Sequence, residues 1–508
     1  RKPDDDGTVS WQILMMRQLD VPFAQRGDKS IFICPSHRNT YPQDAYRTYA
    51  LNLSGAEPTV DAPRLLSLTN PSQTALLVES RFIDPIADTY RQSCELVGLC
   101  DSSATRRRWH QQRLCKEYGI DPIPDYGIED FDRMLAEGQP DTVVVCVPDS
   151  LHHEYIVRSL EFGADVICEK PLTTDADKFA VIEDAVRRTG KRVRTTFNYR
   201  WAPGATQVRK LIAEGAIGTV KHVDFEYMLN TAHGADYFRR WHSYKELSGG
   251  LFVHKCTHHF DLINWWIDAI PETVFAMGAL AFYGKDNAVA RGQEALTRYD
   301  RYTGVEASEG DPFRMNLEGD PTLKGLYLEA EKDSGYIRDE NVFREGIDIE
   351  DSLSATIRYR SGVIASYSLN AYCPAEGFRV AITGDEGRLE YSETHAAHII
   401  TGDRDIKFEP TASRGASLKV HRLFEEPQVI PINMPEGGHG GADPLIQEQM
   451  FSENPAPESY GRNAGHQQGA ASLLVGAAGN RSIATGQAIR ITDLYPLSPE
   501  SVQLSELI

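Results

Sequence analysis

The sequence predicts an α/β protein with two parts: an N-terminal doubly wound parallel sheet and a C-terminal α+β domain with a large, mainly antiparallel sheet. Over residues 73–196, short apolar runs alternate with amphipathic stretches of helical length, which is typical of a parallel sheet covered on both faces. Beyond residue 200 apolar residues recur at every second position, which indicates antiparallel strands. A chain of 508 residues also exceeds what one compact core usually holds.

Composition and charge limit the class of protein. The formal net charge of −20 argues against nucleic acid or an anionic membrane as the main partner. No apolar run approaches the length of about 18 residues that a membrane-spanning helix needs. The 8 cysteines are scattered without a CxxC pair, which favours reduced thiols and a cytoplasmic location.

The parallel-sheet domain is expected over residues 73–196. Residues 1–72 are expected to form an N-terminal extension, partly disordered, with one short strand in the stretch IFICPSHRNTYP. The amphipathic stretches of the sheet domain end at glycines that suit the C-terminus of a helix. Its strands are predicted in the apolar runs at 74–78, 94–101, 141–149, 163–171 and 191–200.

The second domain is expected over residues 197–508. A polar, acidic segment at 285–346 interrupts the second sheet and predicts an insertion that folds over one edge. A stretch rich in small residues at 465–486 predicts a closely packed helix. The antiparallel strands are predicted in the alternating runs at 221–229, 272–284, 352–360, 362–372 and 378–391.

The motif CEKP at 168–171 follows a predicted parallel strand. Ligands bind beyond the carboxyl ends of such strands, so Lys170 is expected to project into the crevice. A lysine there can bind a substrate hydroxyl, and desolvation lowers its pKa towards proton transfer. The alternative is a surface lysine in a turn between strand and helix.

The stretch GGLFVHKCTHHFDLINWW at 249–266 places four side chains on one helix face, because His254, His258, Asp261 and Trp265 are spaced at i, i+4, i+7 and i+11. Two imidazoles and a carboxylate suit a proton relay in which His258 exchanges the proton and Asp261 or His254 orients it. A purely structural stripe is a further alternative. A metal site is another, but the stretch lacks the HExxH glutamate and a convincing third ligand, and Lys255 lies beside it.

Taken in order, these motifs resemble the Gfo/Idh/MocA oxidoreductases. The resemblance rests on the strand followed by EKP, the strand followed by NYR, the turn VPDSLHHE at 147–154 and the GG motif before the histidine helix. It covers residues 73–490 and implies a Rossmann-type first domain in an NAD(P)-dependent enzyme that acts on sugars or cyclitols. The segment VHKCTHHFD resembles a long branch of the family.

The resemblance implies roles for individual residues. Lys170 and His258 match the family's catalytic lysine and histidine, and His254 stands where many members have aspartate; Asp261 completes the expected catalytic set. No metal is implied. The substrate is expected to contact Lys170, Tyr199, Lys255, His258 and His259. The cofactor is expected to contact Asp101, Ser80, Arg81, Pro148, His152, Glu169, Lys170, Asn198 and Arg200.

Asp101 ends the second predicted strand and matches the position that binds the adenosine ribose. A carboxylate there repels the 2′-phosphate of NADP and favours NAD, whereas the neighbouring Arg106 and Arg107 leave NADP open.

The chain departs from the family pattern at Glu79, where a glycine loop is expected. Ser80 and Arg81 resemble the end of such a loop. Three functions therefore stand open: a sugar-directed dehydrogenase, a redox-assisted glycoside cleavage with tightly bound NAD, and a catalytically silent relative that lost its pyrophosphate loop. The resemblance also implies a homo-oligomer, a dimer or tetramer, formed through the open face of the antiparallel sheet.

Overall fold

The computed structural model describes residues 30–33, 96–119, 121–397, 400–401, 406–407, 415–433, 438–452 and 454–507. The predicted strand at 74–78, together with Glu79, Ser80 and Arg81, lies outside the described residues.

The N-terminal sheet has the order β17-β6-β5-β4-β1-β2-β3. Its strands are parallel, except that β17 pairs with β6 in the antiparallel sense. The predicted runs at 94–101, 141–149, 163–171 and 191–200 contain β2, β4, β5 and β6 and are confirmed. The strands are β1 (Ser30–Ile33), β2 (Leu96–Cys100), β3 (Asp125–Tyr126), β4 (Thr142–Val145), β5 (Asp165–Cys168), β6 (Val193–Thr195) and β17 (Ala464–Gly465).

The strand between β2 and β4 comes from the segment expected to be an extension. β1 pairs in parallel with both neighbours, with Ser30 opposite Leu96 on one side and Thr142 on the other. Its sequence, Ser-Ile-Phe-Ile, has the apolar composition of a central parallel strand. Strand order reverses between β1 and β4, and such a reversal opens a crevice at the carboxyl ends of the strands.

Three of the four helices of this domain are capped at the C-terminus by a glycine, as their sequences predict, whereas α3 is capped by Gln139. Ser103 caps α2, and its hydroxyl accepts from the Arg106 backbone N–H at 3.1 Å. Gly119, Gly163 and Gly190 adopt the left-handed conformation at three helix C-termini. The helices are α2 (Ala104–Tyr118), α3 (Phe131–Gly138), α4 (His152–Phe162) and α5 (Ala176–Thr189).

The C-terminal sheet has the order β16-β15-β12-β11-β7-β10-β9-β8-β18. Only the β7–β10 pairing is parallel among these described strands, so the predicted mainly antiparallel sheet is confirmed. A separate pair joins β13 (Ile400–Thr401) and β14 (Ile406–Lys407). The nine strands of the large sheet are β7 (Val220–Asn230), β8 (Pro271–Ala279), β9 (Ser352–Tyr359), β10 (Ile364–Cys373), β11 (Glu376–Gly384), β12 (Gly387–Ala396), β15 (Gly415–Arg422), β16 (Gln428–Ile430) and β18 (Ile489–Arg490).

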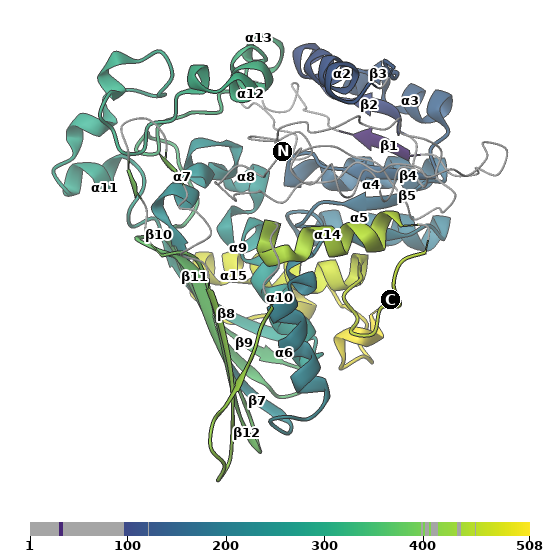
Figure 1. Ribbon diagram of the computed structural model, residues 1–508, viewed down its shortest axis with the longest axis vertical. Coiled ribbons are helices and arrows are strands. Elements are labelled where there is room, and N and C mark those ends of the chain that lie inside the picture. The colour runs from purple at the N-terminus through teal and green to yellow at the C-terminus, as the bar shows by residue number, and fades with distance from the viewer. Residues whose placement is uncertain are drawn as a thin grey trace.

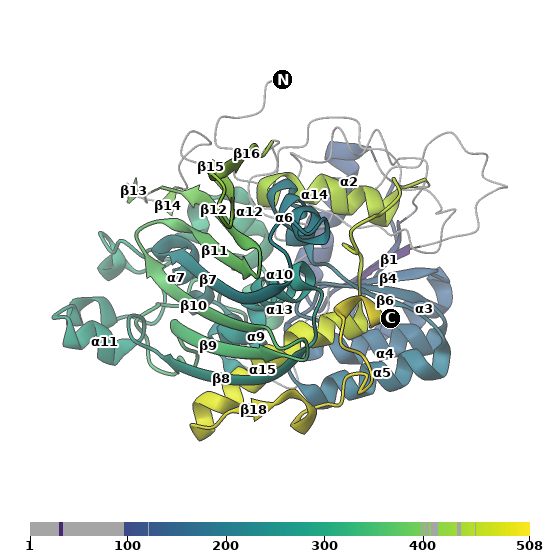
Figure 2. The ribbon, with the colours of Figure 1, turned by 90° about the horizontal axis from the view of Figure 1, so that it is seen from below.

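Helices separate the two sheets (Figures 1 and 2). The predicted small-residue helix is α15, which packs against β8, α10 and α5 and so touches both domains. Gly476 allows this close packing, because a Cβ there would lie 2.5 Å from the Phe252 carbonyl oxygen. The helices are α6 (Pro203–Ala213), α7 (Thr231–Arg239), α8 (Lys245–Ser248), α9 (Gly250–His254), α10 (Thr257–Ile267), α14 (Gly438–Phe451) and α15 (His466–Thr485).

The predicted insertion leaves the sheet after β8 and reaches across to α2 of the first domain (Figure 1). A second small core holds it there, in which Trp241, Leu326 and Tyr327 are buried and Trp109 of α2 packs against them. Its helical segments include α11 (Lys285–Ala290), α12 (Pro321–Leu323), the π-helical turn Lys324–Leu328 and α13 (Glu331–Ser334).

Candidate active site

Lys170 lies at the carboxyl edge of the parallel sheet, directly after β5. The ladder continues to Glu169, whose backbone N–H donates to the Val145 carbonyl at 3.0 Å. Lys170 is 8% exposed, and its Nζ donates to the His254 carbonyl oxygen at 3.0 Å. Burial lowers the pKa of Lys170, while Asp149 and Glu169 oppose that shift.

His254 reaches Lys170 from α9 in the second domain. Gly249 and Gly250 have φ values of 69° and 72°, which glycine adopts without strain, and this turn directs the start of α9. His254 Nε2 lies 3.3 Å from Lys170 Nζ, and its Nδ1 lies 2.5 Å from Asp149 Oδ2. Both histidine nitrogens therefore contact groups of the first domain.

His258 lies on α10, beyond the break between α9 and α10. Its ring centroid is 4.7 Å from that of Tyr199 and 6.4 Å from that of Phe197. These two aromatic residues follow β6, whereas Lys170 follows β5. The predicted lysine and histidine thus both sit over the carboxyl ends of neighbouring parallel strands.

Lys255 and His259 occupy different surroundings. The Lys255 ammonium lies 5.0 Å from the ring centroid of Tyr227 and 5.9 Å from that of Tyr199, and burial lowers its pKa to about 8. His259 Nδ1 lies 2.7 Å from the Tyr367 hydroxyl, and its ring stacks with those of Tyr227 and Phe225. His259 is completely buried within the packing of the antiparallel sheet.

Asp261 and Arg200 are joined to each other. Arg200 Nε and Nη2 donate to the two Asp261 carboxylate oxygens at 2.7 Å and 2.6 Å, and both side chains are buried. Arg200 Nη1 also donates to the Gly461 carbonyl and to Gln468 Oε1. This pair ties the turn after β6 to α10 and to the segment before α15.

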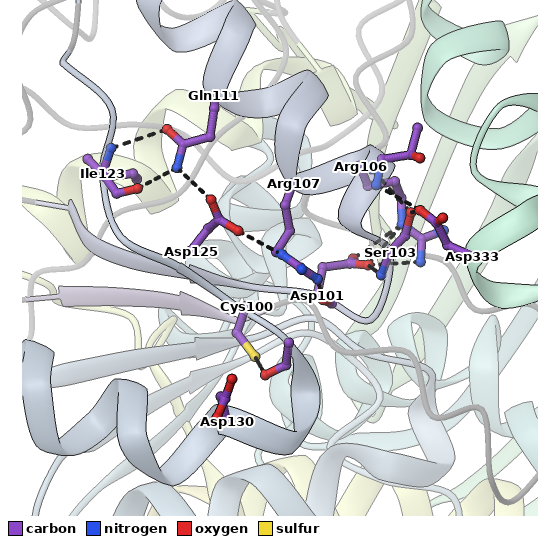
Figure 3. A network of polar contacts seen from close by, with 12 residues as sticks. Cys100, Asp101, Ser103, Arg106, Arg107, Gln111, Ile123, Asp125, Asp130 and Asp333 are labelled. Carbon is purple, nitrogen blue, oxygen red and sulfur yellow. Dashed lines mark hydrogen bonds and ion pairs between the residues drawn. The ribbon is translucent and has the colours of Figure 1, made fainter.

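Asp101 follows β2 and is buried beside α2 (Figure 3). Its Oδ1 accepts from the Ser103 backbone N–H at 2.6 Å and from Arg106 Nη2 at 3.0 Å. Arg107 donates to the Asp101 carbonyl and pairs with Asp125 at 2.8 Å. Arg106 and Arg107, the two arginines that could accommodate the 2′-phosphate of NADP, are therefore both paired with carboxylates of the chain.

The insertion contributes to this region. Asp333 Oδ2 accepts from the Ser103 hydroxyl at 2.8 Å and from the Thr105 backbone N–H at 2.7 Å, at the N-terminus of α2. Sequence reasoning missed Asp333, because nothing local indicates which distant helix an acidic insertion reaches.

The other predicted cofactor residues cluster after β4, β5 and β6. Pro148 accepts from the Leu151 backbone N–H at 2.8 Å and so shapes the turn after β4. His152 lies with Nδ1 2.8 Å from the Pro171 carbonyl and Nε2 2.9 Å from the Val147 carbonyl, which links the turns after β4 and β5.

The predicted cofactor residues Glu169 and Asn198 have hydrogen-bond partners within the protein. Burial raises the pKa of Glu169 to about 8, and its Oε2 accepts from the Thr196 hydroxyl at 3.0 Å. Asn198 Nδ2 donates to Asp443 Oδ1 at 3.2 Å. Asp443 lies in α14, at the end of the stretch GGHGGAD at 437–443, so this helix packs over the same edge of the sheet.

These residues fit a dinucleotide at the reversal of strand order. Two buried polar atoms at this edge, Ser150 Oγ and Asn198 Oδ1, have no hydrogen-bond partner among the described residues, as expected of groups that receive a polar ligand. Asp101 supplies the carboxylate after β2. The residues expected to meet the pyrophosphate, Ser80 and Arg81, lie outside the described residues.

Asp149 is a site residue that sequence reasoning missed. It is completely buried, directly follows β4 and holds His254. Ligands bind beyond the carboxyl ends of parallel strands, and Asp149 follows β4 as Lys170 follows β5. The position of this aspartate in VPDS, at 147–150, could therefore have identified it.

A metal site, a membrane-spanning helix and a second pocket place different requirements on the described part of the chain. No group of three or more His, Cys, Asp or Glu side chains there is placed to hold a metal ion. No helix within the described ranges is long and apolar enough to cross a membrane. A hollow on the outward face of the antiparallel sheet includes Glu226, Arg379 and Lys419 in its lining but none of the predicted site residues.

A Rossmann-type sheet with a buried lysine and histidine at its carboxyl edge is the arrangement expected of a nucleotide-dependent oxidoreductase. Residues 77–197 match the description "Oxidoreductase family, NAD-binding Rossmann fold", and residues 209–491 match "Oxidoreductase family, C-terminal alpha/beta domain". The chain belongs to this GFO/IDH/MocA family and is an NAD(P)-dependent oxidoreductase.

Three similar proteins show how far the likeness extends. The putative oxidoreductase YteT of Bacillus subtilis is 36% identical over 82% of this chain and 96% of its own length. D-glucoside 3-dehydrogenase of Escherichia coli is 30% identical over 30% of this chain and 42% of its own length. The fold matches that of aldose-aldose oxidoreductase from Caulobacter crescentus, crystallised with glycerol, with a TM-score of 0.53, 15% identity and coverage of 91% and 100% of the two chains.

Proposed function

We propose that the protein oxidises a secondary alcohol of a sugar-like substrate, with Lys170 and His258 handling the proton and NAD as the preferred cofactor. One observation carries the proposal: Lys170 contacts His254, which in turn contacts the buried Asp149. A desolvated lysine at the sheet edge is thereby connected to a carboxylate.

The protein side of the reaction follows from the positions of these groups. Desolvation favours the neutral amine of Lys170, which can accept the proton of a substrate hydroxyl. His258, beside Tyr199, is placed to hold the same hydroxyl or its neighbour. Asp101, Glu169 and Asn198 would hold the cofactor, which supplies the hydride acceptor when bound.

A carbohydrate, glycoside or cyclitol substrate is supported by two lines of argument. The glucoside dehydrogenase and the aldose-aldose oxidoreductase named above act on sugars by their names. In this chain the aromatic rings of Tyr199 and Tyr227 lie beside the buried Lys255, which suits the apolar faces and hydroxyls of a sugar.

The preference for NAD is supported by Asp101. Arg106 is held by Asp101 and Arg107 by Asp125, so both guanidinium groups already have carboxylate partners. A 2′-phosphate would have to displace one of these pairs and approach the Asp101 carboxylate.

Two measurements test the proposal. Calorimetric titration of the full chain with NAD⁺ and NADP⁺ should show binding, tighter for NAD⁺; the absence of binding by either would favour the catalytically silent relative. A screen of sugars, glycosides and cyclitols should then give substrate-dependent NADH. Turnover of a glycoside without NADH accumulation would instead support redox-assisted cleavage.

The remaining expectations extend the proposal. The boundary at 196/197 divides a cofactor domain at 73–196 from a substrate and oligomerisation domain at 197–508. The boundary at 72/73 separates the cofactor domain from the N-terminal extension, from which β1 joins the sheet of the cofactor domain. A dimer or tetramer would form through the outward face of the large sheet, and the enzyme would act in the cytoplasm.

A further inference from the structure

We propose that Asp149 is the terminal acceptor of a proton relay that runs from Lys170 through His254, which makes Asp149 a positioning residue for the reaction. The inference rests on the proposed function, because it assigns the route taken by the proton that the substrate hydroxyl releases.

Lys170, His254 and Asp149 come from three segments and form a continuous chain of contacts. Lys170 Nζ lies 3.3 Å from His254 Nε2, and His254 Nδ1 lies 2.5 Å from Asp149 Oδ2. The imidazole therefore bridges an amine and a carboxylate through its two different nitrogens, which is the geometry that a relay requires. The second Lys170 contact, with the His254 carbonyl at 3.0 Å, fixes the amine beside the ring.

The surroundings of Asp149 favour its protonated form, which a residue that only orients the His254 ring would not require. Its side chain is completely buried at the start of the 3-10 turn Asp149–Leu151, and its second oxygen, Oδ1, has no hydrogen-bond partner in the described structure. An ionised carboxylate is costly in such a position, whereas a neutral acid is tolerated. Burial accordingly raises the pKa of Asp149, and the charge of Lys170 opposes that shift.

Two proton arrangements satisfy these contacts with the same total charge. In the first, the Lys170 ammonium donates to Nε2 and the Nδ1–H donates to the Asp149 carboxylate. In the second, one proton has moved from Nζ to Nε2 and another from Nδ1 to Oδ2, which leaves a neutral amine, imidazole and carboxylic acid. Before the reaction the three groups hold one proton fewer: a neutral Lys170 amine, a neutral imidazole with its proton on Nδ1, and an Asp149 carboxylate. When the substrate O–H bond breaks, its proton forms an N–H bond on Lys170 and gives the first arrangement. The shift to the second arrangement then returns Lys170 to the neutral amine and leaves the proton on Asp149, away from the reacting carbon.

Other titratable groups face the relay. Glu169 and Lys255 lie near Lys170, and Lys178 and Glu169 act on Asp149. The His242 ring lies 4.3 Å from that of His254, and the Tyr237 ring lies 5.5 Å away. His152 and His259 also feel the charge of Lys170, but burial lowers the pKa of both and keeps them neutral.

Glu169 is the competing acceptor, and the contacts favour Asp149. Glu169 Oε2 accepts from the Thr196 hydroxyl, on the side of β6. Only Asp149, of these two acids, is in hydrogen-bond contact with His254 among the described residues.

The test compares Asp149→Asn with wild type in the full chain. Asparagine keeps the shape and can still accept from Nδ1–H, but it cannot take a proton. We expect kcat to fall by about 10²–10³-fold with little change in the substrate KM, in the range typical of general base catalysis. We also expect the acid limb of the pH profile to move to lower pH, because the charge that stabilised the Lys170 ammonium is gone.

Two further variants separate a relay from a structural role. In a serial relay, Asp149→Asn added to His254→Asn should cost no more than His254→Asn alone. Asp149→Glu, which restores a carboxylate, should recover part of the lost kcat. The control is Asp311→Asn, which removes a buried carboxylate that holds Tyr299 in the insertion and should leave kcat and the pH profile unchanged.

One readout does not depend on turnover. The pKa of Lys170 can be measured by competitive labelling with acetic anhydride across pH, followed by peptide mass spectrometry. Asp149→Asn should lower that pKa by at least half a unit relative to wild type, and Asp311→Asn should not. An unchanged Lys170 pKa, or wild-type kcat in Asp149→Asn, overturns the relay. If wild type oxidises no alcohol, the proposed function fails, and the labelling result still decides whether Asp149 and Lys170 are coupled.

Discussion

Removal of the Arg200 guanidinium should destabilise the protein more than it affects cofactor binding. Arg200 was expected to bind the cofactor, but its side chain and that of Asp261 are 0% and 1% exposed and form a two-point ion pair. In Arg200→Met the Asp261 carboxylate would remain buried without its partner. Breaking a buried pair in this way costs about 3–5 kcal/mol, and the lost bonds to Gly461 and Gln468 place the expected value in the upper half.

The stability assay is thermal unfolding followed by circular dichroism. For a unit of about 150–250 residues, 1 kcal/mol corresponds to about 2–4 °C, so a cost of about 4–5 kcal/mol should lower Tm by about 8–20 °C. Burial raises the pKa of Asp261, Arg200 opposes that shift, and loss of Arg200 raises this pKa further. The loss of stability should therefore be largest near neutral pH and shrink as acid protonates Asp261.

A matched variant separates loss of the pair from loss of the side chain. Arg200→Met with Asp261→Leu removes both charges and should be more stable than Arg200→Met alone, because no uncompensated carboxylate remains. A variant Arg200→Met with wild-type Tm and much weaker NAD⁺ binding would refute this reasoning and favour direct contact with the cofactor.

Three other predictions concern single residues. Lys170→Met should reduce kcat by about 10²–10⁴-fold while calorimetry still detects NAD⁺ binding, and a fully active variant would remove Lys170 from the mechanism. Asp101→Ser should lower the affinity for NAD⁺ relative to NADP⁺, because it frees Arg106 and removes the repelling carboxylate; an unchanged ratio would contradict the role of Asp101. Asp333→Ala should cost about 1–2 kcal/mol and speed amide exchange in the insertion, since two hydrogen bonds to α2 are lost. Burial alone would raise the Asp333 pKa, but the bonds from Thr105 and Ser103 lower it below its usual value, so its stabilisation should hold above about pH 4 and disappear in stronger acid, where variant and wild type should converge.

The sequence determined the architecture of both domains. Periodicity located β2, β4, β5 and β6 and the strands from β7 to β12, because one apolar face or a fully apolar run is a local property of the chain. The helix ends followed from local chemistry as well, with glycine in the left-handed conformation at Gly119, Gly163 and Gly190. The order of EKP, NYR and the GG motif identified the family.

Only the tertiary structure decided which strand occupies the place between β2 and β4 and which partner each polar side chain has. The short strand predicted near residue 31 is β1, but nothing local showed that it belongs to the first sheet, where pairing with β2 and β4 gives it its place. His254, His258 and Asp261 share a helical spacing, yet the break between α9 and α10 sends His254 to Asp149 and Lys170, while Asp261 meets Arg200. Spacing along one helix is fixed by the backbone. The pairing of charges instead depends on residues 61 to 105 positions apart, and the sequence alone does not specify which of them meet.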